Sequence, residues 1–124
     1  MTSDEAFADE QLSLHVDHVG DVAVVVARGE IDLATVGGFR TVLNDLMVDG
    51  HVDVVVDLSD VPFVDSSALG ALVAAHRRAR GLGGALSVAG IQAPVARILE
   101  LTGLDRVLAS YPTARDAVGR VDQG

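Results

Sequence analysis

The chain has 124 residues, 49% of them hydrophobic, and carries 18 acidic side chains against 9 basic ones, for a formal net charge of −9. This length suits one domain with a buried core. So acidic a surface repels nucleic acid and anionic lipid, which are bound mainly by clustered positive charge. The sequence contains no cysteine, which excludes disulfides and thiolate metal sites.

The two ends of the chain are polar, and apolar segments recur throughout the part between them. We expect a single domain over residues 11–119, a flexible acidic tail at 1–10 and a short C-terminal tail at 120–124. No stretch approaches the roughly 18–20 apolar residues that span a bilayer, and the N-terminus has no apolar run typical of a secretory signal. The expected location is therefore the cytoplasm, without membrane or nucleic-acid partners.

The hydrophobic pattern predicts two strands and a helix in the first half of the chain. Apolar segments at 12–16 and 22–27, separated by a turn-like stretch, predict an antiparallel hairpin. Apolar residues at helical spacing follow from Phe39 to Leu46, and Asp49-Gly50 ends that helix. The run at 52–58 is almost continuously apolar, as in a strand that is covered on both faces.

The second half continues the alternation. The expected elements are a helix at 67–80, a strand at 85–89, a helix from about Pro94, a short strand at 107–108 and a last helix at 112–118. Strands that alternate with helices predict an α/β layer structure with a largely parallel sheet.

The most informative stretch is Val-Asp-Ser-Ser-Ala-Leu-Gly at 64–70, where the exit from a strand becomes the start of a helix. The first N–H groups of a helix lack intrahelical partners and its dipole is positive there, so a phosphate would meet ready donors. Asp65 is a good N-cap candidate, which would leave the Ser66 hydroxyl free and facing solvent. The same letters also fit a plain capping sequence in which Ser66 or Ser67 is the cap.

A phosphate on Ser66 would change the charge of this region strongly. It would add about −1.5 to −2 charges near neutral pH, beside Asp65 and near Asp32 and Asp60. The helix start would favour this charge, but a surface pressed against a partner would suffer repulsion and desolvation. We therefore expect phosphorylation to eject a partner rather than to unfold the domain.

Enzyme chemistry has little support in the sequence. Asp57 ends an apolar strand like the phospho-acceptor of a receiver domain, but the chain lacks that domain's carboxylate pair and its lysine. Ser66 and His76 lie ten residues apart on one predicted helix, roughly 15 Å, which is too far for a nucleophile and its base. His15 and His18 have no further ligands at metal-binding spacing. We expect neither an enzyme nor a metal site.

Five segments of the chain, in order, carry a resemblance to a known family. They are residues 29–35, 55–59, 63–70, 84–88 and 98–105, within a match that runs from about 12 to 118. Together they resemble the bacterial anti-sigma factor antagonists (anti-anti-sigma factors), the stand-alone form of the STAS domain. The resemblance implies a mixed four- or five-stranded sheet, largely parallel with an N-terminal antiparallel hairpin, and helices mainly on one face.

The resemblance also implies partner switching. The unmodified protein would bind an anti-sigma factor serine kinase and so release a sigma factor. The kinase would use its own Mg-ATP to phosphorylate Ser66, and a PP2C-type phosphatase would reverse the reaction. The chain itself would need no cofactor and would be a monomer when free. The implied partner-binding residues are Asp32, Glu30, Asp65, Ser66, Ser67 and Leu69.

One alternative within the same fold stays open. The chain could be a STAS ligand-binding or scaffold subunit of a transport or stress-signalling assembly. Ser66 and Ser67 would then act only as helix caps, and replacing either would cost no more than about 1 kcal/mol of capping energy.

Overall fold

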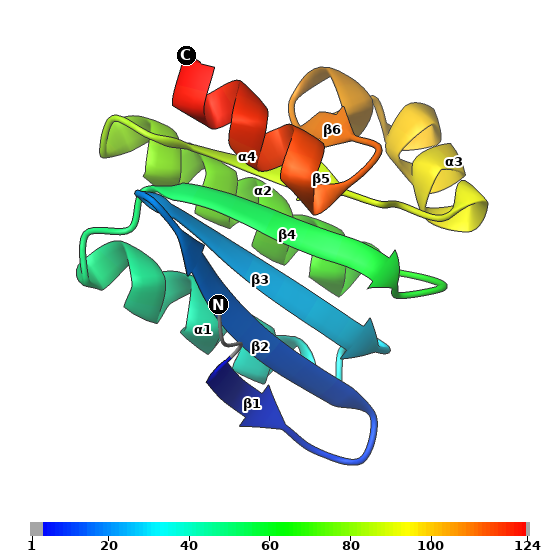
Figure 1. Ribbon diagram of the computed structural model, residues 1–124. Coiled ribbons are helices and arrows are strands. Elements are labelled where there is room, and N and C mark those ends of the chain that lie inside the picture. The colour runs from blue at the N-terminus through cyan, green and yellow to red at the C-terminus, as the bar shows by residue number, and fades with distance from the viewer. Residues whose placement is uncertain (1–3, 124) are drawn as a thin grey trace.

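The computed structural model describes residues 4–123 and contains one six-stranded sheet with strand order β1-β2-β3-β4-β5-β6 (Figure 1). The strands are β1 (Asp4–Ala8), β2 (Leu12–Val19), β3 (Val22–Gly29), β4 (Asp53–Asp60), β5 (Ala85–Ala89) and β6 (Ala109–Tyr111). The helices are α1 (Val36–Val48), α2 (Ser66–Gly81), α3 (Ala93–Thr102) and α4 (Ala114–Gln123), with a 3₁₀ turn η1 (Leu104–Arg106). Strands β1 to β3 pair antiparallel, and β3 to β6 pair parallel.

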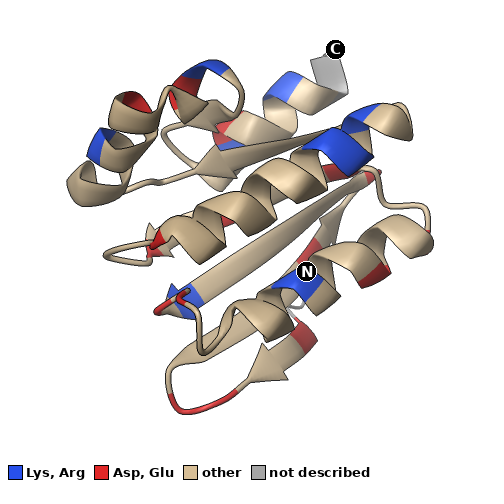
Figure 2. Ribbon diagram, turned by 180° about the vertical axis from the view of Figure 1, so that it is seen from behind, with Lys and Arg blue, Asp and Glu red and all other residues tan. Residues whose placement is uncertain are grey.

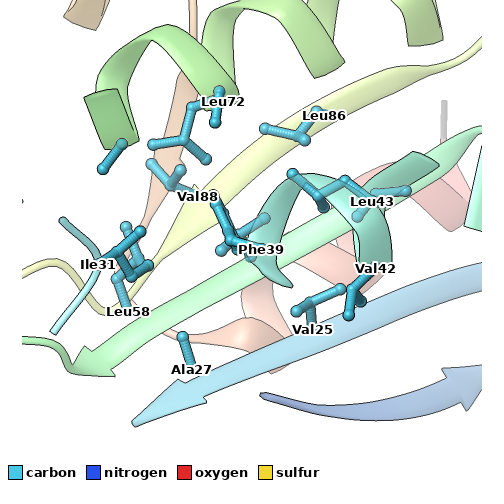
Figure 3. Packing of buried hydrophobic residues seen from close by; sticks show 14 of the residues in the cluster. Val25, Ala27, Ile31, Phe39, Val42, Leu43, Leu58, Leu72, Leu86 and Val88 are labelled. Atoms are coloured by element: carbon cyan, nitrogen blue, oxygen red, sulfur yellow. The ribbon is translucent and has the colours of Figure 1, made fainter. Parts of the chain in front are cut away.

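The main core lies between one face of the sheet and helices α1, α2 and α3. Phe39 of α1 is fully buried at its centre, among side chains such as Val25, Leu72 and Val88 (Figure 3). A smaller apolar cluster on the opposite face of the sheet is covered by α4 alone. The α/β fold, the antiparallel hairpin and the placement of helices mainly on one face are thus confirmed, but the sheet has six strands rather than four or five.

The additional strand comes from the segment that the sequence predicted as a flexible tail. Residues 4–8 form β1, which pairs with β2 at the edge of the sheet. The half-buried ring of Phe7 lies against Gly38 of α1, where any larger residue would overlap the ring. Edge pairing with β2 and the contact of Phe7 with Gly38 hold a strand whose other residues are exposed. Residues 1–3 of the predicted tail lie outside the described residues.

The C-terminal elements are shifted from the prediction. Strand β6 begins at Ala109, two residues later than the predicted strand at 107–108, because the backbone N–H groups of Val107 and Leu108 close a turn onto Leu104 O. Helix α4 continues to Gln123 and so enters the predicted C-terminal tail. None of the helices within residues 4–123 is long and apolar enough to cross a bilayer.

Parallel strands bring two connecting loops together at one edge of the sheet. The β3–α1 loop and the β4–α2 loop leave neighbouring strands at their carboxyl ends. They pair through a parallel bridge between Ile31 and Val64, both of which are buried. At the ends of the same strands, Arg28 Nε and Asp60 Oδ2 form an exposed ion pair of 3.2 Å. Figure 2 shows both basic and acidic segments at this end of the sheet. This edge carries the residues that the sequence singled out.

Candidate functional site

Asp65 is the N-cap of α2 and also ties the two loops together. Its backbone is extended, and its Oδ1 accepts hydrogen bonds from Ala68 N at 3.0 Å and Ser67 Oγ at 2.5 Å. Its Oδ2 accepts from Leu33 N at 3.0 Å, across 32 positions of sequence. The predicted cap is therefore confirmed, and the alternative in which a serine caps the helix is wrong.

These hydrogen bonds set the charge state of the cap. The Ser67 hydroxyl lowers the pKa of Asp65 most, followed by the Ala68 N–H, while partial desolvation opposes them and the Leu33 N–H adds to the lowering. Donors that point at a carboxylate favour its ionised form. Asp65 is consequently an anion at neutral pH whose oxygens already accept three hydrogen bonds, which makes it a poor proton acceptor for chemistry on its neighbour.

The two adjacent serines have different environments. Ser66 is the first residue of α2 and its side chain is exposed, as the sequence predicted. Ser67 is half-buried, and its hydroxyl is engaged by Asp65. Of this pair, Ser66 is the one that an incoming protein can reach, and it lies where the positive end of the helix dipole favours negative charge.

The β3–α1 loop is held by a reciprocal pair of side chains. Asp32 Oδ1 accepts from Ala34 N at 2.9 Å, and Thr35 Oγ1 both accepts from Asp32 N at 3.0 Å and donates to Glu30 O at 2.8 Å. Thr35 is only 2% exposed. Half-buried Asp32 thus shapes the loop, whereas Glu30 is exposed beside it. Thr35 is not among the site residues predicted from the sequence, although an Asp followed three positions later by Thr is a recognisable turn signal.

Apolar side chains near Ser66 are distributed differently from the expectation. Leu69 is only 8% exposed and packs in the main core, so it holds α2 against the sheet and offers little surface to a partner. Leu33 and Phe63 are 80% and 56% exposed and lie on the two paired loops. We call Glu30, Asp32, Leu33, Phe63 and Ser66 the Ser66 surface. Exposed apolar residues on two loops that pair with each other are consistent with a protein interaction site.

An α/β domain that presents an exposed serine at a helix start, between two loops with apolar tips, has the features of a regulatory binding domain. The STAS domain family matches residues 13–117, and the chain therefore belongs to this family. An anti-sigma-F factor antagonist of Mycobacterium tuberculosis is 32% identical over 112 residues, which cover 86% of this chain and 90% of that protein.

Two further relatives agree. An anti-sigma F factor antagonist of Paenibacillus polymyxa is 25% identical over 112 residues, covering 90% of this chain and 96% of that protein. The crystal structure of an anti-sigma factor antagonist from Mycobacterium paratuberculosis superposes with a TM-score of 0.83 at 30% identity, covering 93% of this chain and 97% of that one. The chain is thus related, over nearly its full length, to the anti-sigma factor antagonists.

Proposed function

We propose that this protein is an anti-sigma factor antagonist that binds an anti-sigma factor kinase and is released from it by phosphorylation of Ser66. The observation that carries the proposal is the contrast at the start of α2. The Ser66 side chain is exposed, while Asp65 and Ser67 are bound to each other. The names of the relatives from M. tuberculosis and P. polymyxa, both antagonists of anti-sigma F factors, supply the class of partner.

The Ser66 surface defines what the partner must offer. Leu33 and Phe63 project apolar side chains, and Glu30 and Asp32 add negative charge at the same edge. A matching surface would bury the two apolar groups in a recess and place basic side chains opposite the carboxylates, since complementary charge guides association. The net charge of −9 favours such a basic partner surface over long range as well.

In the proposed phosphoryl transfer, the kinase would supply the nucleotide and the catalytic base, and this chain would supply only the Ser66 hydroxyl. The Ser66 Oγ would form a bond to the γ-phosphorus of the kinase's Mg-ATP as the bond to the β-phosphate oxygen breaks, and ADP would leave. The hydroxyl proton would pass to a base of the kinase, because the pKa of the adjacent Asp65 is lowered by its hydrogen bonds. A PP2C-type phosphatase would hydrolyse the phosphoserine and restore the binding form.

Phosphate at this position would act on the interface more than on the fold. It would lie at the positive end of α2, where negative charge is stabilising. Toward the partner, it would bring about −1.5 to −2 charges to a surface that already holds several carboxylates. Repulsion and the cost of removing phosphate from water would then separate the two proteins.

The proposal is tested by mixing the chain with candidate anti-sigma kinases and Mg-ATP, and mapping phosphate by mass spectrometry. Ser66→Ala should take up no phosphate and stay bound to the kinase, and Ser66→Asp should bind weakly from the start. Ser67→Ala is the matched control, because it removes the neighbouring hydroxyl and leaves Ser66 available. Phosphate absent from Ser66 with every paired kinase, or Ser66→Asp that binds as tightly as the wild type, would contradict the proposal.

A further inference from the structure

A basic side chain of α1 lies over the helix that begins with Ser66. Helices α1 and α2 lie side by side on one face of the sheet, and both start at the same edge because each joins two parallel strands (Figure 1). Arg40 is the fifth residue of α1, and Gly70 is the fifth residue of α2. Arg40 Nη2 lies 3.8 Å from the point that a Cβ on Gly70 would occupy. The guanidinium of Arg40 therefore reaches across to the surface of α2, one turn after Ser66.

Gly70 leaves the space between Ser66 and Arg40 open. A glycine inside a helix is less favourable than an alanine, so it calls for a reason. Gly70 is exposed and its φ is not positive, so neither packing nor backbone conformation requires it. Apart from its neighbours on α2, Arg40 Nη2 is the one heavy atom of the described residues within 4 Å of an added Cβ. The effect of the missing side chain is to let the guanidinium lie close to the surface of α2.

The distance between Ser66 and Arg40 is within reach of a phosphate. Residues four apart on a helix have Cβ atoms about 5–6 Å apart, so Arg40 Nη2 is at most about 10 Å from the Ser66 Cβ. Phosphorylation would lengthen the Ser66 side chain toward solvent, and Arg40 is a long, exposed side chain that can rotate. The two groups can therefore meet without any movement of the backbone. A guanidinium presents paired N–H donors that match the oxygens of a phosphate.

The charges around Ser66 make such a partner for the phosphate important. Carboxylates of Glu30, Asp32 and Asp65 lie on the two loops next to Ser66, and each would repel a phosphate there. Among the side chains of residues 4–121, the ion pair within 4.0 Å joins other residues, so the guanidinium of Arg40 is not engaged by a carboxylate. Arg40 is consequently a cation that is available to a new anion at the start of α2.

We infer that Arg40 binds the phosphate of phosphorylated Ser66 within the same chain, across the open surface of Gly70. The inference rests on the proposed function, because that function supplies the phosphate. It adds a second consequence of phosphorylation. In the unmodified chain the Arg40 guanidinium is exposed beside Ser66 and open to a partner, whereas in the phosphorylated chain it is occupied by the phosphate. Phosphorylation would thus add negative charge and also withdraw a positive one from the surface.

The test uses the full chain with phosphoserine incorporated at position 66 during translation, so that no kinase is needed. Phosphorus-31 NMR measures the pKa of the phosphoserine, which is ordinarily about 6. A guanidinium in contact favours the dianion, so this pKa should be about 0.5 higher in Arg40→Gln than in the wild type. The Nε–H signal of Arg40 should also shift between the unmodified and the phosphoserine chain.

Arg77→Gln is the matched control. Arg77 is exposed on the same face of α2 as Ser66 but lies 11 residues further on, roughly 17 Å along the helix. At 0.15 M salt the Debye length is about 8 Å, so this variant should leave the phosphoserine pKa within about 0.1 of the wild type. Circular dichroism of each variant checks that it is folded.

Three outcomes would overturn the inference. They are a phosphoserine pKa that is the same in Arg40→Gln and the wild type, an equal rise in Arg77→Gln, and an Arg40 Nε–H signal that does not respond to the phosphate. The result is independent of the kinase experiment above. If no kinase modifies Ser66 but the titration shows the effect of Arg40, the proposed function fails and the contact stands. If a kinase modifies Ser66 and the titration shows no effect of Arg40, only the contact is refuted.

Discussion

Replacing Leu33 by alanine should weaken the complex with the anti-sigma kinase without affecting the fold. Leu33 is 80% exposed, and its backbone N–H, which donates to Asp65, is kept in the variant. The change removes three carbon atoms, and burial of each is worth about 0.8 kcal/mol. Scaled by the exposed fraction, the loss is about 2 kcal/mol, or roughly a 30-fold higher Kd.

Isothermal titration calorimetry with the unphosphorylated chain measures this change directly. Val48→Ala is the control, since Val48 is 71% exposed but lies at the other end of α1, roughly 18 Å along the helix from its start. Urea unfolding should give free energies of unfolding for Leu33→Ala within about 0.5 kcal/mol of the wild type. A Kd unchanged in Leu33→Ala, or raised equally in Val48→Ala, would refute the assignment of the Ser66 surface as the interface.

Three further predictions concern the framework of the site. The pKa of Asp65 is lowered from 3.8 in the folded chain, so its hydrogen bonds stabilise the fold above this value and lose that effect as the pH falls below it. Asp65→Asn should therefore make the free energy of unfolding, measured with urea, depend less on pH in the acid range. Thr35→Val removes a hydroxyl that bonds two backbone groups of the β3–α1 loop and should cost about 2 kcal/mol by the same assay, whereas no cost would mean that water replaces it. Gly37→Ala should stabilise α1 by about 0.5–1 kcal/mol, because nothing lies near the added methyl. Gly38→Ala should not stabilise the wild-type chain, because the added methyl displaces the Phe7 ring, but it should stabilise a Phe7→Ala chain. Equal free energies of unfolding for Gly37→Ala and Gly38→Ala would show that Phe7 does not pack there.

The elements and the cap could be predicted because their causes are local in the chain. Apolar spacing gave the helices, and an Asp directly before two serines gave the N-cap, whose partner Ala68 is three residues away. The missed strand at the N-terminus depends on a contact that joins distant segments. Strand β1 depends on pairing with β2 and on the contact between Phe7 and Gly38. The local sequence of residues 4–8 does not predict that contact.

The two leucines near Ser66 also separate what local sequence predicts from what tertiary contacts decide. Leu69 and Leu33 are the same residue type near the same serine, yet one is 8% and the other 80% exposed. Helical spacing places Leu69 on the covered side of α2, whereas the family resemblance implied a contact with the partner. The exposure of Leu33 depends on where its loop crosses the β4–α2 loop, and a bond to Asp65 across 32 positions fixes that crossing.

The amino-acid order alone determined the α/β alternation, the capped start of α2 and the candidate serine, because hydrogen bonds within a turn and the period of a helix act over a few residues. Folding decided which apolar side chains remain uncovered, and it left the Ser87 hydroxyl without a hydrogen-bond partner among the side chains that the structure describes. Those properties depend on the packing of segments far apart in the chain, and burial is set by all neighbours in space at once.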